Sequence, residues 1–177
     1  PQGALFGYSD YYVARIPTDS STELIWKRTE YYDSNFHIRY GGITCDKTFV
    51  YVAGDDNAYI AFDKETGDTI WHIETDFQQM FASPFVISNP CGLIIGFTNK
   101  NYDLKYQARD KENGEFICEF PYAYSGRASM CVGEDGYAYY WDDEEIYKFS
   151  MEDASELKHI DMANIFEPYS QIFDVMV

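Results

Sequence analysis

The sequence has little positive charge. Its 177 residues include 13 Lys and Arg against 30 Asp and Glu, which gives a formal net charge of −17. A surface of this sign repels the phosphates of nucleic acids and anionic membrane surfaces, so we expect no nucleic-acid partner and no peripheral membrane role. Long apolar runs are also missing, since none approaches the roughly 18 residues that a membrane-spanning helix needs.

The cysteine pattern lacks the short spacing of a metal or redox site. Cys45, Cys91, Cys118 and Cys131 lie 46, 27 and 13 residues apart, so no pair forms a C-x-x-C motif. An even number permits two disulfides, but the sequence does not decide between the possible pairings. The alternative that we favour is four free thiols buried in a β core.

Signatures of common catalytic sites are absent as well. His37, His72 and His159 fit neither H-E-x-x-H nor H-x-x-x-H spacing, and there is no G-x-S-x-G elbow or phosphate-binding loop. The acidic run at 142–145 offers oxygen ligands for Ca²⁺, but it lacks the glycine and the alternation of an EF-hand loop. The sequence therefore predicts no catalytic residue, no cofactor-binding residue and no metal ligand.

What the sequence does contain is a repeat. Residues rich in β-branched and aromatic side chains at 49–53 and 58–62 flank a Gly-Asp-Asp-Asn turn, which predicts a β-hairpin. A second turn, D-K-E-T-G, runs from Asp63 to Gly67 and leads into a strand at 68–73. The Asp side chain can bond back to the backbone of such a turn, and Gly can take the positive φ that it requires.

The same turn returns 47 residues later, between Asp110 and Gly114, with Cys118 in the place that Trp71 takes in the first copy. A weaker copy with Trp26 precedes these two, and a fourth follows with strands at 137–141 and 146–149. Helical periodicity is almost absent, and only 152–164 could hold a short helical turn.

Four short strands in about 45 residues are typical of a β-propeller blade. We therefore predict an all-β fold of antiparallel four-stranded blades, about three and a half to four of them, forming one partial propeller over 1–177. Because each blade buries its faces against its neighbours, an incomplete ring leaves apolar faces for other polypeptide to cover. The predicted repeats, followed by the start of a further strand, are 1–33, 34–80, 81–124, 125–164 and 165–177.

The segment Y-I-A-F-D-K-E-T-G-D-T-I-W, from Tyr59 to Trp71, resembles the repeat of the PQQ-like, or quinoprotein-type, β-propellers. The resemblance implies that the Trp side chains dock between adjacent blades and that the Asp…Gly turn fixes their register. Cys118 would fill a smaller space and weaken one contact unless a neighbour such as Phe120 or Tyr122 compensates. The predicted blade-packing residues are Trp26, Trp71, Asp63, Gly67, Asp110 and Gly114.

Three functions are compatible with this resemblance. We favour a non-enzymatic protein-interaction or scaffold module that is completed by, or associates with, other polypeptide as a homo- or hetero-oligomer. Non-catalytic members of the family suggest an extracellular, periplasmic or lumenal location. The alternatives are a fragment of a PQQ-dependent quinoprotein dehydrogenase and an acidic calcium-dependent extracellular binding domain. No residue matches the catalytic base or Ca²⁺ ligands of the dehydrogenases, so no cofactor is expected.

Tyrosine is abundant, with 17 residues of this type. Large, partly polar side chains suit recognition surfaces. They suit the alternating faces of β strands equally well, so both interpretations stay open. The tyrosines that we select as a possible interaction surface are Tyr31, Tyr32, Tyr122, Tyr124, Tyr139 and Tyr140.

Overall fold

The fold is all-β, as predicted. A computed structural model places fifteen strands and no helix in the part of the chain that it describes. In that part no helix has the length and apolar character needed to cross a membrane. The described residues are 5–9, 12–19, 21–29, 43–53, 58–74, 85–89, 91–98, 104–121, 129–141 and 145–161.

The strands form four antiparallel sheets, one after another along the chain, which we call blades 1 to 4. Blades 2 to 4 have four strands each, and the described part of blade 1 has three. Blade 1 comprises β1 (Leu5–Ser9), β2 (Tyr12–Ile16) and β3 (Trp26–Arg28). Blade 2 comprises β4 (Ile43–Cys45), β5 (Phe49–Ala53), β6 (Ala58–Asp63) and β7 (Thr69–Glu74). Blade 3 comprises β8 (Phe85–Asn89), β9 (Gly92–Thr98), β10 (Leu104–Arg109) and β11 (Phe116–Glu119), and blade 4 comprises β12 (Ser129–Val132), β13 (Ala138–Trp141), β14 (Glu145–Phe149) and β15 (Glu156–Asp161).

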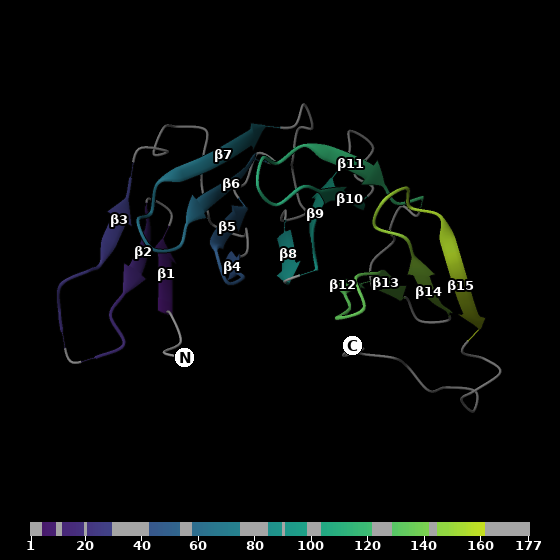
Figure 1. Cartoon of the computed structure of the whole chain (residues 1–177), viewed down its shortest axis with the longest axis horizontal. Helices are drawn as coiled ribbons and strands as arrows, with labels where there is room; N and C mark the ends of the chain where they lie inside the picture. Colours follow the sequence, from purple (N-terminus) through teal and green to yellow (C-terminus); the bar gives the residue numbers. More distant parts are fainter. Residues whose placement is uncertain are drawn as a thin grey trace.

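The blades stand side by side along an open arc, with blade 1 at one end and blade 4 at the other (Figure 1). The first strands of the blades lie on the inner side of the arc, and the last strands, β3, β7, β11 and β15, lie on its outer side. Within each blade, strands adjacent in sequence pair with each other, so the connections are hairpins. This is the arrangement of propeller blades around an axis.

Blade 2 shows why the sequence folds this way. Its central strands pair in register from Phe49↔Asp63 to Ala53↔Tyr59, and both are β-branched or aromatic over most of their length. Successive side chains point to opposite faces of a sheet. Both faces of these strands are buried, because blade 1 covers one and blade 3 covers the other. The result is a continuous apolar run rather than an alternating one.

The core is divided into three clusters, each between two adjacent blades. Blades 1 and 2 enclose Val13, Trp26, Val50, Val52, Ala58, Ile60 and Phe62. Blades 2 and 3 enclose Tyr51, Ala53, Tyr59, Ala61, Trp71, Leu93 and Ile95. Blades 3 and 4 enclose Ile94, Tyr106, Ala108, Cys118, Phe120, Met130, Val132, Ala138, Tyr140, Tyr147 and Phe149. Stability therefore comes from contacts between neighbouring blades.

Two predictions about local structure are wrong. The helical turn expected within 152–164 is replaced by β15, which pairs with β14 and completes blade 4. None of the four cysteines forms a disulfide, as expected, but Cys118 alone is buried. Cys131 is half-buried, and Cys45 and Cys91 are exposed because they lie at the ends of the inner hairpins. The further strand expected at 165–177 lies outside the described residues.

Candidate functional site

The turns that join the last two strands of each blade, which we call outer turns, position the residues that connect the blades. In blade 2, Oδ1 of Asp63 accepts hydrogen bonds from the backbone N–H groups of Glu65 and Thr66, each at 2.8 Å. These bonds, that of Thr66 first, hold the pKa of Asp63 below its ordinary value. Gly67 closes the turn with φ of +73°, a conformation that disfavours any residue with a Cβ. The outer turn of blade 3 repeats this geometry, with Gly114 at φ of +75°.

Each Trp of the repeat packs on the outer turn of the next blade. The Trp26 ring of blade 1 donates its Nε1–H to the carbonyl oxygen of Lys64 at 3.1 Å. A Cβ on Gly67 would lie only 2.6 Å from that ring. Trp71 of blade 2 donates to the carbonyl oxygen of Lys111 at 2.9 Å, and a Cβ on Gly114 would lie 2.9 Å from its ring. Glycine is therefore required at these turns by backbone conformation and by space together.

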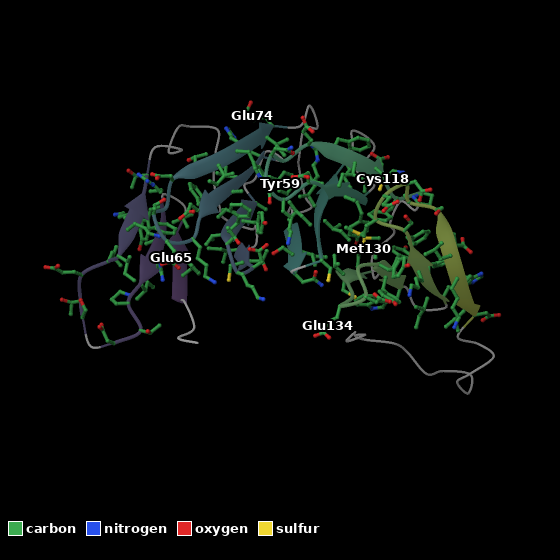
Figure 2. All side chains as sticks on the ribbon, in the orientation of Figure 1. Tyr59, Glu65, Glu74, Cys118, Met130 and Glu134 are labelled. Atoms are coloured by element: carbon green, nitrogen blue, oxygen red, sulfur yellow. The ribbon has the colours of Figure 1, made fainter. Side chains whose placement is uncertain are left out.

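The third interface keeps this arrangement with smaller side chains. Cys118 takes the Trp position, and its Sγ lies 3.4 Å from the carbonyl oxygen of Met151, which is the second residue of the outer turn of blade 4. Burial raises the pKa of the Cys118 thiol. The glycine position holds Ala154, at φ of 56°. Figure 2 labels Cys118 close to the place where blades 3 and 4 meet.

Phe120, one of the two compensating neighbours that the sequence suggested, lies at this third interface. It is 1% exposed, and its ring centroid is 5.7 Å from that of Phe149 in blade 4. The other suggested neighbour, Tyr122, lies outside the described residues. Cys118, Phe120 and Phe149 belong to one buried cluster, so aromatic side chains pack in the interface where the docking residue is small.

Ion pairs cross the first interface, between blades 1 and 2, and the second interface, between blades 2 and 3. Arg15 of blade 1 pairs with the Glu65 carboxylate on the outer turn of blade 2, beside which Figure 2 places the label of Glu65. Arg28 pairs with Asp68 at 2.6 Å across the same interface. Between blades 2 and 3, the Nζ of Lys111 lies 3.2 Å from Oδ2 of Asp46.

The Asp46 carboxylate is the most deeply buried member of these pairs. Burial acts to raise its pKa, but hydrogen bonds from the backbone N–H groups of Phe49 and Thr48, together with Lys111, outweigh that effect, and the net pKa lies below the ordinary value. At the third interface, between blades 3 and 4, a neutral contact joins the blades instead of an ion pair. The side-chain amide of Asn89 donates to the carbonyl oxygen of Val132.

The predicted tyrosine surface is only partly described. Tyr31, Tyr32, Tyr122 and Tyr124 lie outside the described residues. Tyr140 is 4% exposed and packs against Tyr106 of blade 3, so its assignment to an interaction surface is wrong. The physical reason is the alternation of side chains along β13, which turns Tyr140 toward blade 3 and its neighbour Tyr139 away from it.

Tyr139 belongs to a polar group on the face of blade 4 that points away from blade 3, which we call the far face. Its hydroxyl donates to Oδ2 of Asp135 at 2.6 Å, and Lys148 pairs with the same oxygen at 2.7 Å. These two contacts, that of Lys148 first, lower the pKa of Asp135 to about 2. The Nζ of Lys148 also lies 4.0 Å from the centroid of the Tyr137 ring. Sequence reasoning missed Asp135 and Lys148.

Nothing in the described part of the chain has the geometry of a metal centre. No three His, Cys, Asp or Glu side chains are grouped there so that they could hold an ion. The acidic run that raised the calcium alternative falls mostly outside the described residues, and Glu145 alone of its members is described. Its carboxylate contacts Tyr147 and His159.

The serial antiparallel blades, with outer-strand side chains docked on the next outer turn, are the arrangement of a β-propeller. No family model matches the sequence, and no curated protein matches it significantly. Solved structures are similar to it at the level of fold. BamB from Moraxella catarrhalis has a TM-score of 0.60 at 15% identity, and the match covers 88% of this chain and 45% of that one.

Two oxidoreductases are similar to the same extent. A quinohemoprotein alcohol dehydrogenase from Comamonas testosteroni has a TM-score of 0.61 at 17% identity, covering 90% of this chain and 33% of that one. A europium-containing methanol dehydrogenase has a TM-score of 0.63 at 11% identity, covering 90% and 40%. These proteins are PQQ-like β-propellers, so the predicted fold resemblance is confirmed. The chain spans less than half the length of each of these structures.

Proposed function

We propose that this chain is a non-enzymatic protein-interaction or scaffold module, an acidic portion of a PQQ-like β-propeller that is completed by, or associates with, other polypeptide. The observation that carries the proposal is the open arc of blades (Figure 1). Each internal blade of the arc is buried on both faces by its neighbours, whereas within the described residues blades 1 and 4 each have a neighbouring blade on one face only. Propeller blades gain their stability by such stacking.

The chemistry of the described residues supports binding over catalysis. Several charged side chains between blades form ion pairs that join one blade to the next, such as Arg28 with Asp68 and Lys111 with Asp46. These groups hold structure rather than a reacting centre. An extracellular, periplasmic or lumenal location suits such a module, and the structurally similar proteins are periplasmic or extracellular.

Sedimentation velocity over a wide range of protein concentration tests this proposal. We expect the chain to self-associate or to bind added propeller polypeptide, because end faces of a blade stack favour contact with other protein. The association should weaken when the apolar part of a blade end is replaced by polar residues. A compact monomer at every concentration, with no binding to other polypeptide, would contradict the proposal.

The similarity to quinoprotein dehydrogenases keeps one enzymatic alternative, a fragment of such an oxidoreductase. Reconstitution with pyrroloquinoline quinone and Ca²⁺, followed by a dye-linked assay with alcohols and sugars, distinguishes it. Oxidation above the level of quinone alone would replace the interaction module with this alternative. The interaction module predicts no such activity.

A further inference from the structure

One cross-strand pair differs in character between the blades. It joins the strand before each outer turn to the strand after it, and in blade 2 its two members face the next blade along the arc, where they contact Leu93 and Ile95. In blades 2 and 3 one member of the pair is an alanine, and the other is the docking Trp or Cys. From blade 1 to blade 4 the pairs are Arg15↔Trp26, Ala61↔Trp71, Ala108↔Cys118 and Lys148↔Lys158.

Blade 4 therefore places two lysines directly opposite each other on its far face. Like charges at directly opposite positions of an antiparallel pair destabilise the sheet. Among the described residues, the carboxylate of Asp135 lies at this pair and bonds to Lys148. Lys158 lies exposed at the position where Trp26 and Trp71 are covered by the next blade. The far face thus combines this lysine pair, one of whose members is bonded to Asp135, with the apolar residues Trp141, Ile146 and Ile160 at its other cross-strand positions, in a chain whose net charge is −17.

The first interface shows what a basic residue does at this position. Arg15, the counterpart of Lys148, crosses to the next blade and bonds to two groups of its outer turn, the carbonyl oxygen of Lys64 and the Glu65 carboxylate. The outer turns of blades 2 and 3 both carry acidic residues at the first and third positions, in D-K-E-T-G and D-K-E-N-G. An outer turn of this kind is the natural partner of a basic pair.

The counterpart position of Lys158 makes a further bond at the other interfaces. Trp26 and Trp71 donate hydrogen bonds to the carbonyl oxygen of the second residue of the next outer turn, and the Cys118 thiol lies against the same group. A lysine ammonium is also a donor and can bond to that carbonyl or to a neighbouring carboxylate. Blade 4 therefore keeps the donor while it loses the apolar ring.

We propose that the far face of blade 4 binds a further propeller blade through an acidic outer turn, whose carboxylates pair with Lys148 and Lys158. The inference rests on the proposed function and adds the chemistry of the partner to it. The partner supplies negative charge and acceptor oxygens at the point where the first two interfaces use an indole. Its outer turn has no need of the glycine that Gly67 and Gly114 provide beneath a Trp ring.

The test uses the full chain and a head-to-tail cyclic peptide with the sequence of residues 60–73, which contains the acidic outer turn of blade 2. Binding is measured by fluorescence anisotropy, and carbodiimide coupling, which joins lysine to carboxylate, locates the contact by mass spectrometry. We expect saturable binding with cross-links at Lys148 or Lys158. The variant Lys148→Glu/Lys158→Glu should bind at least about tenfold more weakly, and Lys148→Arg/Lys158→Arg should bind like the parent chain.

Two controls exclude a general effect of charge or folding. Lys27→Glu/Lys47→Glu changes the net charge by the same amount on blades 1 and 2 and should leave binding unchanged. A peptide with lysines in place of its three carboxylates at Asp63, Glu65 and Asp68 should bind the Lys148→Glu/Lys158→Glu variant in preference to the parent chain. This charge exchange restores binding only when the variant is folded, so it separates loss of contact from loss of structure.

The outcomes distinguish this inference from the function on which it rests. If the chain associates in sedimentation but the peptide fails to bind, or is cross-linked to lysines on other blades, the assignment of the far face is overturned and the interaction module stands. If the chain neither associates nor binds, both are overturned. Equal binding to the parent chain and to the Lys148→Glu/Lys158→Glu variant also overturns the inference.

Discussion

The first two blade interfaces and the third solve one packing problem with different pairs of residues. Between blades 1 and 2, and between blades 2 and 3, a Trp ring covers a glycine at positive φ. Between blades 3 and 4, a Cys lies against the turn of an Ala at positive φ. In all three interfaces the donor of the docking side chain faces the carbonyl of the second residue of the next outer turn. The contact between the docking side chain and the outer turn is thus present in all three interfaces. A large docking residue, Trp, accompanies glycine in the turn, and a small one, Cys, accompanies alanine.

This comparison shows that the Trp and the glycine act as one unit. A Cβ on the glycine would lie within 3 Å of the indole, so a large docking side chain excludes alanine from the turn. Where the docking side chain is small, alanine is accommodated, although its backbone conformation is one that residues with a Cβ rarely take. The larger buried surface of Trp should make the first two interfaces the stronger ones.

The largest expected effect separates the two kinds of interface by truncation. Trp71→Ala should lower the free energy of unfolding by about 3–5 kcal/mol, because it empties a buried indole site and removes the hydrogen bond from the indole to the carbonyl of Lys111. Cys118→Ala removes one sulfur and should cost only about 1 kcal/mol. Urea unfolding followed by circular dichroism measures both. Equal losses would show that the Trp does not dominate its interface.

Addition of a methyl group to the turn tests whether the pair is coupled. Gly114→Ala should destabilise the chain by about 1–3 kcal/mol, because it combines backbone strain at φ of +75° with a contact of 2.9 Å to Trp71. In a Trp71→Cys background the contact with the indole is gone, and the strain and the 2.9 Å contact with the flexible end of Ile73 should be left. A double-mutant cycle of the four proteins measures the coupling, which we expect to be about 1 kcal/mol. Additive losses would contradict coupling.

A pH titration contrasts the charged link of the second interface with the neutral link of the third. The pKa of Asp46 is lowered in the folded chain, so its carboxylate stabilises the fold above its unfolded pKa, near 4, and this contribution is lost as the pH falls through the folded pKa. Asp46→Asn should cost about 1–2 kcal/mol at pH 7 and flatten the acid limb of the stability curve.

Asn89 supplies the matched control for that titration. Its amide bonds to the backbone of blade 4 without a charge, so Asn89→Ala should lower stability by the same amount at pH 3 and at pH 7. Thermal unfolding at several pH values compares the two variants. If the Asp46→Asn loss is also independent of pH, the ion pair with Lys111 contributes nothing measurable to the second interface.

The fold could be predicted from the sequence where turn and strand signals coincide. The D-K-E-T-G and D-K-E-N-G turns predicted blades 2 and 3, and in the structure the strands before and after each turn pair as expected. Blade 4 was harder, because its outer turn runs from Ser150 to Ala154 and lacks both the Asp and the Gly of the repeat. Without that signal the residues after it resemble a short helix, and β15 was missed.

The far face of blade 4 depends on information that the sequence does not contain directly. Lys148 and Lys158 become opposite neighbours only because a bulge shifts the register of β14 and β15 after Lys148. The same shift occurs between β6 and β7 and between β10 and β11, so its position could be transferred once the outer turn of blade 4 is recognised. Likewise Tyr139 and Tyr140 are adjacent in sequence, and only the assignment of one face to blade 3 separates them.

The smallest expected effect is at the turn of the third interface itself. Ala154→Gly should raise stability slightly, by less than about 1 kcal/mol, because relief of the strained φ outweighs the loss of one methyl contact and the gain in unfolded-state entropy. A stronger test of the same turn introduces an indole at position 118. Cys118→Trp should destabilise the chain by overpacking against Ala154, and Cys118→Trp/Ala154→Gly should recover most of that loss. Thermal unfolding of the three variants checks the order. If Ala154→Gly fails to improve the Cys118→Trp chain, the aromatic side chains of Phe120 and Phe149 already fill the space, and the third interface is then a separate packing solution rather than a smaller version of the first two.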